Sequence, residues 1–225
     1  MRYPIKHRTM ELAYKIILFL HAFGGGLALL SGLGAIATKK GGAWHTRSGL
    51  VYYWSMMLVI VSGFYVGVAR SNFFLLMIAI FSFYMAYTGK RSLRNKIGFS
   101  LNYWDLTVAF LGLIVSFIMI GLGVRILLVS GGLGSAPMLF VFGAILGFMS
   151  GEDFVNGLKK KTKPGGWLIK HVGRMGGSFI ATSTAFLLVN IDIEPAWVIW
   201  PCPTVVGSVL ITIAIRRLTA KMGSS

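Results

Sequence analysis

Residues 106–124 read LTVAFLGLIVSFIMIGLGV and contain no charged side chain. A helix of about 20 apolar residues crosses the roughly 30 Å hydrocarbon core of a bilayer. The quoted stretch belongs to an apolar run over about 103–129, and six more runs lie at about 12–37, 49–69, 72–88, 136–153, 167–191 and 203–219. Lipid satisfies no backbone polar group, and these unbroken runs lack the alternation of a β-barrel strand. The sequence therefore predicts an all-α integral membrane protein, a bundle of seven transmembrane helices.

The composition supports the same fold class. Of the 225 residues, 56% are hydrophobic and only 12% are charged, about half the charged fraction of an ordinary soluble domain, so a soluble globule is excluded. The connections between runs are short, and we expect one transmembrane domain over 1–222, followed by a Gly223-Ser224-Ser225 tail that resembles a cloning remnant. The single cysteine excludes a disulfide scaffold and any metal site that needs two thiolates.

The net charge of +16 is a topology signal in a membrane chain. In a soluble protein it would indicate nucleic acid, but no nucleic-acid partner is expected here. When the connections are assigned to alternate sides, 16 of the 22 basic residues fall on one side. The positive-inside rule then places the C-terminus in the cytoplasm and the N-terminus outside. The four basic residues near the N-terminus argue for the opposite orientation, and the three concordant internal connections outweigh them.

A dense basic run, Lys159-Lys160-Lys161-Thr162-Lys163, lies in one of these connections. Its simplest role is to hold that connection on the cytoplasmic side. The alternative role is contact with anionic headgroups near Lys159, Lys160 and Lys161, so membrane lipid is the expected partner. The chain is also a candidate for homo-oligomer formation.

Three of the four histidines lie in or at the start of predicted helices, where ionisable residues are costly and usually face the protein interior. His21 lies near mid-membrane on a face of small residues: Gly25, Ala28, Gly32 and Ala35. His45 begins the second helix, on a face with Ser48, Tyr52, Ser55 and Ser62. His171 begins the sixth, on a face with Arg174, Ser178 and Thr182. Both helices are therefore predicted to turn polar faces inward from a histidine at the same cytoplasmic depth.

Glycine supplies 29 residues. Small residues let helix backbones approach, and this role is predicted for Gly24, Gly25, Gly26, Gly32, Gly34, Gly121 and Gly123. None of them has the strand and lysine context of a phosphate-binding loop.

Two carboxylates are predicted at the depth of His45 and His171. Asp105 begins the fourth helix, on a face with Ala109, Gly112 and Ser116, and Asp153 ends the fifth helix beside Glu152. Imidazole together with carboxylate is a ligand set for transition metals. The alternatives are that Asp105 interacts with the positive end of its helix dipole and that Glu152 and Asp153 pair with the adjacent lysines.

A longer pattern combines these residues: His21, Lys40-Gly41-Gly42, His45-Thr46-Arg47-Ser48-Gly49 with Tyr52, and His171 with Arg174-Met175, Ser178, Ala181-Thr182 and Thr184-Ala185-Phe186. It resembles a family of bacterial predicted multi-pass membrane proteins classed as a domain of unknown function. The resemblance covers nearly the whole chain from the first helix to the sixth. It implies a helical protein of the bacterial inner membrane and points to His21, His45 and His171, without implying an activity. Many members carry His-Arg adjacent in the first motif, whereas Thr46 intervenes here, which weakens the expectation for Arg47.

The first functional hypothesis is a b-type haem or a transition metal, bound at the cytoplasmic ends of the helices for membrane redox chemistry or metal-dependent hydrolysis. The expected ligands are His45, His171, Asp153 and Asp105. Arg47 and Arg174 would hold haem propionates. His21 lies roughly 24 Å from that end at 1.5 Å per residue, so either it forms a separate mid-membrane polar site or the first helix breaks at Gly24 to Gly26. No catalytic residue is assigned.

Two other functions stay open. A proton-coupled transporter or channel for a small solute would use the histidines and aspartates as a relay, with the glycines allowing helix movement. A structural or assembly protein without a chemical site would use the polar stripes only for interhelical hydrogen bonds. No soluble-enzyme motif of the G-x-S-x-G or H-E-x-x-H type occurs.

Overall fold

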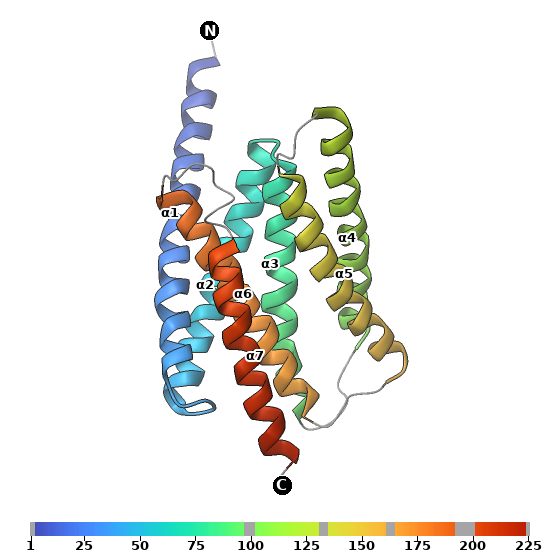
Figure 1. Cartoon of the computed structure of the whole chain (residues 1–225). Helices are drawn as coiled ribbons and strands as arrows, with labels where there is room; N and C mark the ends of the chain where they lie inside the picture. The colour runs from blue at the N-terminus through green and yellow to red at the C-terminus, as the bar shows by residue number, and fades with distance from the viewer. Residues whose placement is uncertain (1–2, 97–101, 131–134, 161–164, 192–200, 224–225) are drawn as a thin grey trace. The chain divides into compact units, whose positions relative to one another are not determined.

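The computed structural model describes residues 3–96, 102–130, 135–160, 165–191 and 201–223. These residues form α1 (Tyr3–Ala37), α2 (Ala43–Ala69), α3 (Phe73–Arg91), a short 3-10 helix η1 (Ser92–Lys96), α4 (Tyr103–Ser130), α5 (Ala136–Leu158), α6 (Gly166–Asn190) and α7 (Pro201–Gly223) (Figure 1). No strand occurs in these ranges. The prediction of an all-α protein with seven long helices is confirmed.

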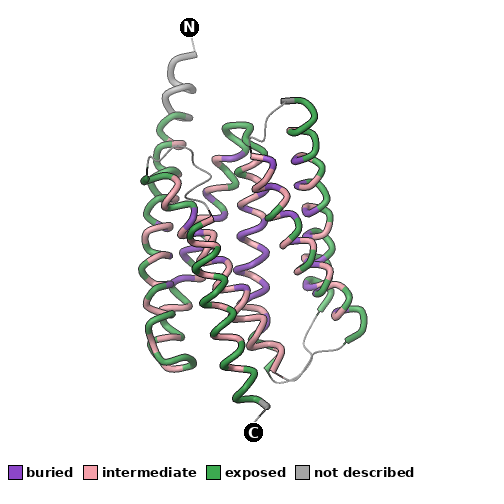
Figure 2. Tube along the Cα trace, viewed as in Figure 1, coloured by how far each residue is buried: buried purple, intermediate pink, exposed green. Residues whose placement is uncertain are grey.

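The surface of these helices is largely apolar. Each of the seven is long and apolar enough to cross a bilayer. None of the described side chains of α7 is buried, and Val205, Val206 and Leu210 are among its exposed residues (Figure 2). Apolar surface on this scale is unfavourable in water and suits contact with lipid tails. The chain is a multi-pass membrane protein.

Two helix boundaries differ from the apolar runs in a way that matters for the site. α2 begins at Ala43 rather than near 49, and α5 continues to Leu158 rather than ending at 153. Hydrophobicity marks only the part of a helix that lies in hydrocarbon, whereas the backbone hydrogen bonds continue into the polar interface. Asp153 therefore lies inside α5, and the prediction that it ends the helix is wrong.

The helices form two compact units. The first comprises Met1–Ala79 and Phe179–Val205, and the second comprises Ile80–Ser178 and Val206–Ser225. The division falls within α3, α6 and α7. Ser224 and Ser225 of the predicted tail lie outside the described residues.

In the first unit, α1 packs against α2 through small residues. A Cβ on Gly32 would lie 2.5 Å from the ring of Phe179 and 3.1 Å from that of Tyr52, so only glycine fits this approach without a shift. A Cβ on Gly25 or Gly26 would meet nothing within 4 Å. The packing prediction is confirmed for Gly24, Gly32, Gly34 and Gly123, and it is wrong for Gly25, Gly26 and Gly121.

In the second unit, α4 packs against α5. Ser116 Oγ donates to the carbonyl of Gly143 at 2.7 Å. A Cβ on Gly147 would lie 2.5 Å from Ser116 Oγ, so glycine at 147 leaves room for the serine.

The predicted inward faces are confirmed by burial in α4 (Asp105, Ala109, Gly112, Ser116), in α2 (Tyr52, Ser55, Ser62) and in α6 (Arg174, Ser178, Thr182).

Candidate functional site

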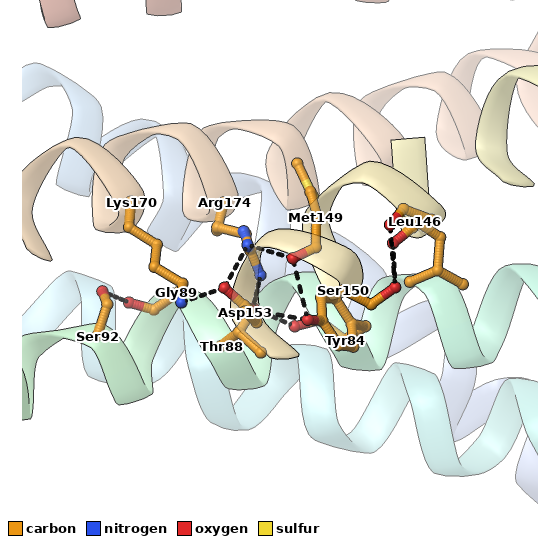
Figure 3. Close-up of polar contacts among 11 residues, drawn as sticks. Tyr84, Thr88, Gly89, Ser92, Leu146, Met149, Ser150, Asp153, Lys170 and Arg174 are labelled. Atoms are coloured by element: carbon orange, nitrogen blue, oxygen red, sulfur yellow. Dashed lines mark hydrogen bonds and ion pairs between the residues drawn. The ribbon is translucent and has the colours of Figure 1, made fainter. Parts of the chain in front are cut away.

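Asp153 of α5 is buried, and its carboxylate accepts hydrogen bonds from three side chains. Arg174 of α6 makes two of these bonds: Nη1 donates to Oδ2 at 2.8 Å, and Nη2 donates to Oδ1 at 3.0 Å. This two-pronged pairing matches the planar guanidinium to the planar carboxylate. Figure 3 shows the two groups facing each other.

Lys170 and Tyr84 supply the other bonds to Asp153. Lys170 Nζ donates to Oδ1, and Tyr84 Oη donates to Oδ2 at 2.6 Å. Arg174 also donates from Nη1 to Thr88 Oγ1 at 2.7 Å. A charge buried in apolar surroundings is stable only when it is paired and hydrogen-bonded, and this carboxylate meets both conditions. We call Tyr84, Thr88, Asp153, Lys170 and Arg174 the Asp153 cluster (Figure 3).

Three helices build the cluster by the same local device. Polar groups four residues apart occur in each helix: Tyr84 and Thr88 in α3, the Met149 carbonyl and Asp153 in α5, and Lys170 and Arg174 in α6. Residues i and i+4 lie on one face of an α-helix, so each helix presents two polar groups one turn apart. Helical periodicity and the packing of α3, α5 and α6 therefore bring these groups to a common centre.

A second ion pair joins α3 to α4. Arg91 Nη2 lies 2.7 Å from Asp105 Oδ2, and the side chains are only 9% and 6% exposed. Asp105 Oδ2 also accepts from the backbone amide of Asn102 at 2.9 Å, while the amide of Asp105 donates to Asn102 Oδ1 at 3.1 Å. These reciprocal bonds form a capping box. Asp105 therefore stabilises the start of α4, as one of the two interpretations of the sequence expected.

A cavity of about 20 Å³ lies beside both ion pairs. Its walls include Asp105 and Arg91 from one pair, and Asp153 and Lys170 from the other. Tyr87 also lines it and donates from Oη to Asp105 Oδ1 at 3.3 Å. Such a volume accommodates about one water molecule. The two ion pairs thus border one small cavity within the second unit.

His45 and His171 have the same local role, each in its own unit. His45 Nδ1 donates to the carbonyl of Ala35 at 2.9 Å, in the last turn of α1. His171 Nδ1 donates to the carbonyl of Gly89 at 2.9 Å, in the last turn of α3. The last carbonyls of a helix lack intrahelical partners and form its negative end. Each histidine therefore stabilises the C-terminal end of another helix.

The turn between α1 and α2 directs His45 to this position. Lys40 Nζ also donates to the Ala35 carbonyl, at 3.0 Å, and to the Ile36 carbonyl, and burial lowers the pKa of its ammonium. Gly41 has a φ of +77°, a left-handed conformation that glycine adopts readily. The amide of Gly42 returns to the carbonyl of Lys39 at 3.0 Å. The Lys40-Gly41-Gly42 motif is therefore explained by a tight turn.

His21 lies in α1, and its contacts are with α2 in the first unit. Its Nδ1 is 3.1 Å from the carbonyl of Val59 and 3.0 Å from Ser62 Oγ. A Cβ on Gly63 would lie 3.3 Å from the imidazole, so glycine at 63 leaves room for the ring.

The structure brings only some of the predicted site residues together. Asp153 and Arg174 form an ion pair, Asp105 pairs with Arg91 instead, and Arg47 is exposed. Arg174, predicted to hold a propionate, has both terminal nitrogens on Asp153. In the part of the chain that the structure describes, no three His, Cys, Asp or Glu side chains form a group that could hold a metal ion.

The sequence pattern misses Tyr84, Thr88, Lys170 and Arg91 as site residues. The charge count assigns Lys170 to a connection, whereas it lies in the second turn of α6 and points to Asp153. Among the described residues, the cationic partners of Asp153 come from α6 and not from the adjacent Lys159 and Lys160, while Lys161 and Lys163 lie outside the described ranges. The four-residue spacing of polar residues in the predicted third and sixth helices is the sequence feature that could have indicated Tyr84, Thr88 and Lys170.

Comparisons of the chain with models of protein families, with curated proteins and with solved structures find no match.

Proposed function

We propose that this membrane protein is a proton-coupled transporter of a small solute, with the Asp153 cluster as its central site. The proposal is carried by the convergence of Asp153, Lys170 and Arg174 inside apolar helices, beside a second ion pair and a shared cavity. Ionisable side chains in transmembrane helices are costly and commonly mark the paths of protons or solutes. A purely structural core does not need them, because well-packed apolar residues are often as stabilising as a buried ion pair.

Metal or haem binding is the second candidate. In both His45 and His171, Nδ1 donates to a backbone carbonyl, which is the orientation that metal-bound histidines commonly have when Nε2 is the ligand. Against this candidate, Asp105 and Asp153 are both engaged by cationic groups that a metal ion would have to displace. We therefore rank transport first.

Absorption spectra of the purified protein, oxidised and reduced, together with elemental analysis, test the second candidate. Haem or metal ligation predicts a Soret band or a stoichiometric metal. The substitutions His45→Ala and His171→Ala should each remove that signal from a folded protein, and His21→Ala should spare it. A wild-type protein with neither signal would rule out this candidate.

Proton-coupled transport is tested with the purified chain in liposomes that contain a pH indicator. Carboxylate, neutral and amine solutes are added outside in turn. We expect one class to drive protein-dependent acidification of the interior. Asp153→Asn should abolish it, and Glu152→Gln, which removes the charge of an exposed neighbour, should not. If no solute moves protons faster than in protein-free liposomes, the transport proposal fails and a structural role replaces it.

We further infer that the protein lies in the bacterial inner membrane, with its N-terminus outside and its C-terminus in the cytoplasm. The distribution of basic residues and the family resemblance support this inference. Lys159 and Lys160 are exposed, as contact with anionic headgroups requires, and Lys161 lies outside the described residues. A reporter fused after Lys160 should be active on the cytoplasmic side, and activity only on the periplasmic side would reverse the orientation.

A further inference from the structure

The Asp153 cluster has the form of a carboxylate-binding site that the chain fills with its own side chain. Both terminal nitrogens of Arg174, Nζ of Lys170 and Oη of Tyr84 donate to the two oxygens of one planar carboxylate. Building on the transport function proposed above, we propose that the solute is a short carboxylate. It takes the place of the Asp153 carboxylate on Arg174 and Lys170, while Asp153 binds a proton.

Charge explains why the anion and the proton bind together. One carboxylate faces two cations in the structure, so the formal charges of Asp153, Lys170 and Arg174 sum to +1. A protonated Asp153 with a bound substrate carboxylate gives the same sum. A substrate anion alone would be repelled by the Asp153 carboxylate, and a proton alone would leave the buried Arg174 and the half-buried Lys170 without a counter-charge. The only covalent change is a new O–H bond on Asp153, formed with a proton from water.

Asp153, rather than Asp105, is the acid that releases its cationic partners and binds a proton. Tyr84 and Thr88 face it from α3, and Lys170 and Arg174 face it from α6 (Figure 3). Arg91, Asp105 and Tyr87 lie across the cavity, where Asp105 is held by Arg91 and by the start of α4. Both aspartates border the cavity. Asp105 also accepts a backbone amide at the start of α4, whereas the hydrogen bonds of Asp153 all come from side chains, so Asp153 is the acid whose carboxyl group can turn into the cavity without uncapping a helix.

The same cavity limits the size of the solute. Once the Asp153 carboxyl group has turned into this cavity of about 20 Å³, the solute has only the space vacated beside Arg174 and Lys170, so only a short carboxylate fits. Glycolate has the required size and charge, and glycolamide and ethanolamine are its neutral and cationic counterparts.

The wild-type experiment compares these three compounds in liposomes with an alkaline interior. An electroneutral symporter that moves one proton with one anion accumulates the anion about tenfold for each unit of pH gradient. We expect glycolate to approach that ratio faster than in protein-free liposomes, with acidification of the interior. Proton-coupled uptake of glycolamide or ethanolamine instead would overturn the carboxylate assignment and leave transport standing. Absence of protein-dependent proton movement with all three would overturn both.

Asp153→Asn separates anion binding from proton coupling. The amide has the shape of a protonated carboxyl group but cannot exchange a proton. We expect the exchange of external for internal glycolate to continue, while accumulation driven by the pH gradient falls to the rate of protein-free liposomes. Glu152→Gln should retain both activities. Retained pH-driven accumulation in Asp153→Asn would overturn the role given to Asp153.

If Asp153→Asn is not monodisperse in gel filtration, the wild-type protein still decides the question through binding. The dissociation constant of glycolate, measured by thermal shift between pH 6 and pH 8, should rise with pH by up to about tenfold per unit, because binding takes up one proton. An affinity that does not depend on pH would overturn the coupling of proton and anion.

Discussion

His21 in the first unit and Asp153 in the second are both ionisable residues inside apolar helices, and their partners differ in kind. His21 lies against a backbone carbonyl and the hydroxyl of Ser62, both on a single helix. Asp153 has two cationic partners and a tyrosine hydroxyl from two helices. An imidazole can stay neutral, so local hydrogen bonds are enough for it, whereas an ionised carboxylate needs converging charges. The charged Asp153 of α5 is therefore held by two other helices, α3 and α6, whereas His21 of α1 needs contacts only with α2.

Removing the guanidinium should be the most damaging change to this arrangement. Arg174→Met leaves the Asp153 carboxylate without its two-pronged partner in the interior, and we expect a loss of about 3–5 kcal/mol in the free energy of unfolding. Denaturant or thermal unfolding in detergent measures it.

The double variant Arg174→Met with Asp153→Leu tests the physical reason for that loss. It removes both charges of the pair, and we expect it to recover most of the lost stability. A double variant as unstable as Arg174→Met would mean that packing of the long arginine side chain matters more than its charge.

Gly32 and Gly25 offer a comparison inside the first unit, where contacts rather than charges hold α1. Gly32→Ala forces a methyl group against Phe179 and should cost about 1–3 kcal/mol. Gly25→Ala meets open space and should leave stability unchanged or slightly raised, since alanine favours helix. Thermal unfolding of the two variants side by side checks this, and equal effects would contradict the close contact at Gly32.

The two histidine caps should have equal effects despite lying in different units. His45→Ala and His171→Ala each remove one hydrogen bond to a helix-end carbonyl, at 2.9 Å in both cases. We expect each to cost about 1 kcal/mol in unfolding free energy. A much larger loss at one of them would show that this histidine does more than stabilise a helix end.

Among the variants that lose a hydrogen bond or an ion pair, the smallest loss of stability is expected beside His21. Ser62→Ala removes the hydroxyl beside His21 but leaves the Val59 carbonyl in place. Interhelical hydrogen bonds in membrane proteins contribute about 0.6 kcal/mol on average, and we expect a loss of that order. Unfolding in the same detergent gives the value, and a loss near that of Arg174→Met would remove the distinction between the two sites.

The sequence predicts the helices and their inward faces well, because both depend on hydrophobicity and a period of 3.6 residues. Tyr52, Ser116 and Ser178 are buried as their spacing implies. The cluster is harder to predict, because the partners of Asp153 lie 69, 17 and 21 residues away in the sequence. Periodicity shows which residues share a face of one helix, but it does not show which helices pack together or through which of their faces.

The histidines illustrate the other limit of sequence reasoning. His45 lies in the first turn of α2 as predicted, whereas His171 lies in the second turn of α6 rather than at its start. Both donate to main-chain carbonyls, those of Ala35 and Gly89. Any residue supplies a carbonyl, so a side-chain pattern carries no sign of such a partner. Patterns of this kind favour a metal site because only side-chain ligands are visible in them.

The four-residue spacing within α3, α5 and α6 restricts how such a chain can change its length over evolution. Each residue added to an α-helix rotates everything after it by about 100°. One insertion between Tyr84 and Thr88 would therefore turn one of them away from Asp153, whatever the inserted residue. Chains that keep the cluster are expected to tolerate substitutions between its members but neither insertions nor deletions. A Y-x-x-x-T spacing in one helix, an Asp in a later helix and a K-x-x-x-R spacing in the next thus form a signature by which distant relatives can be recognised.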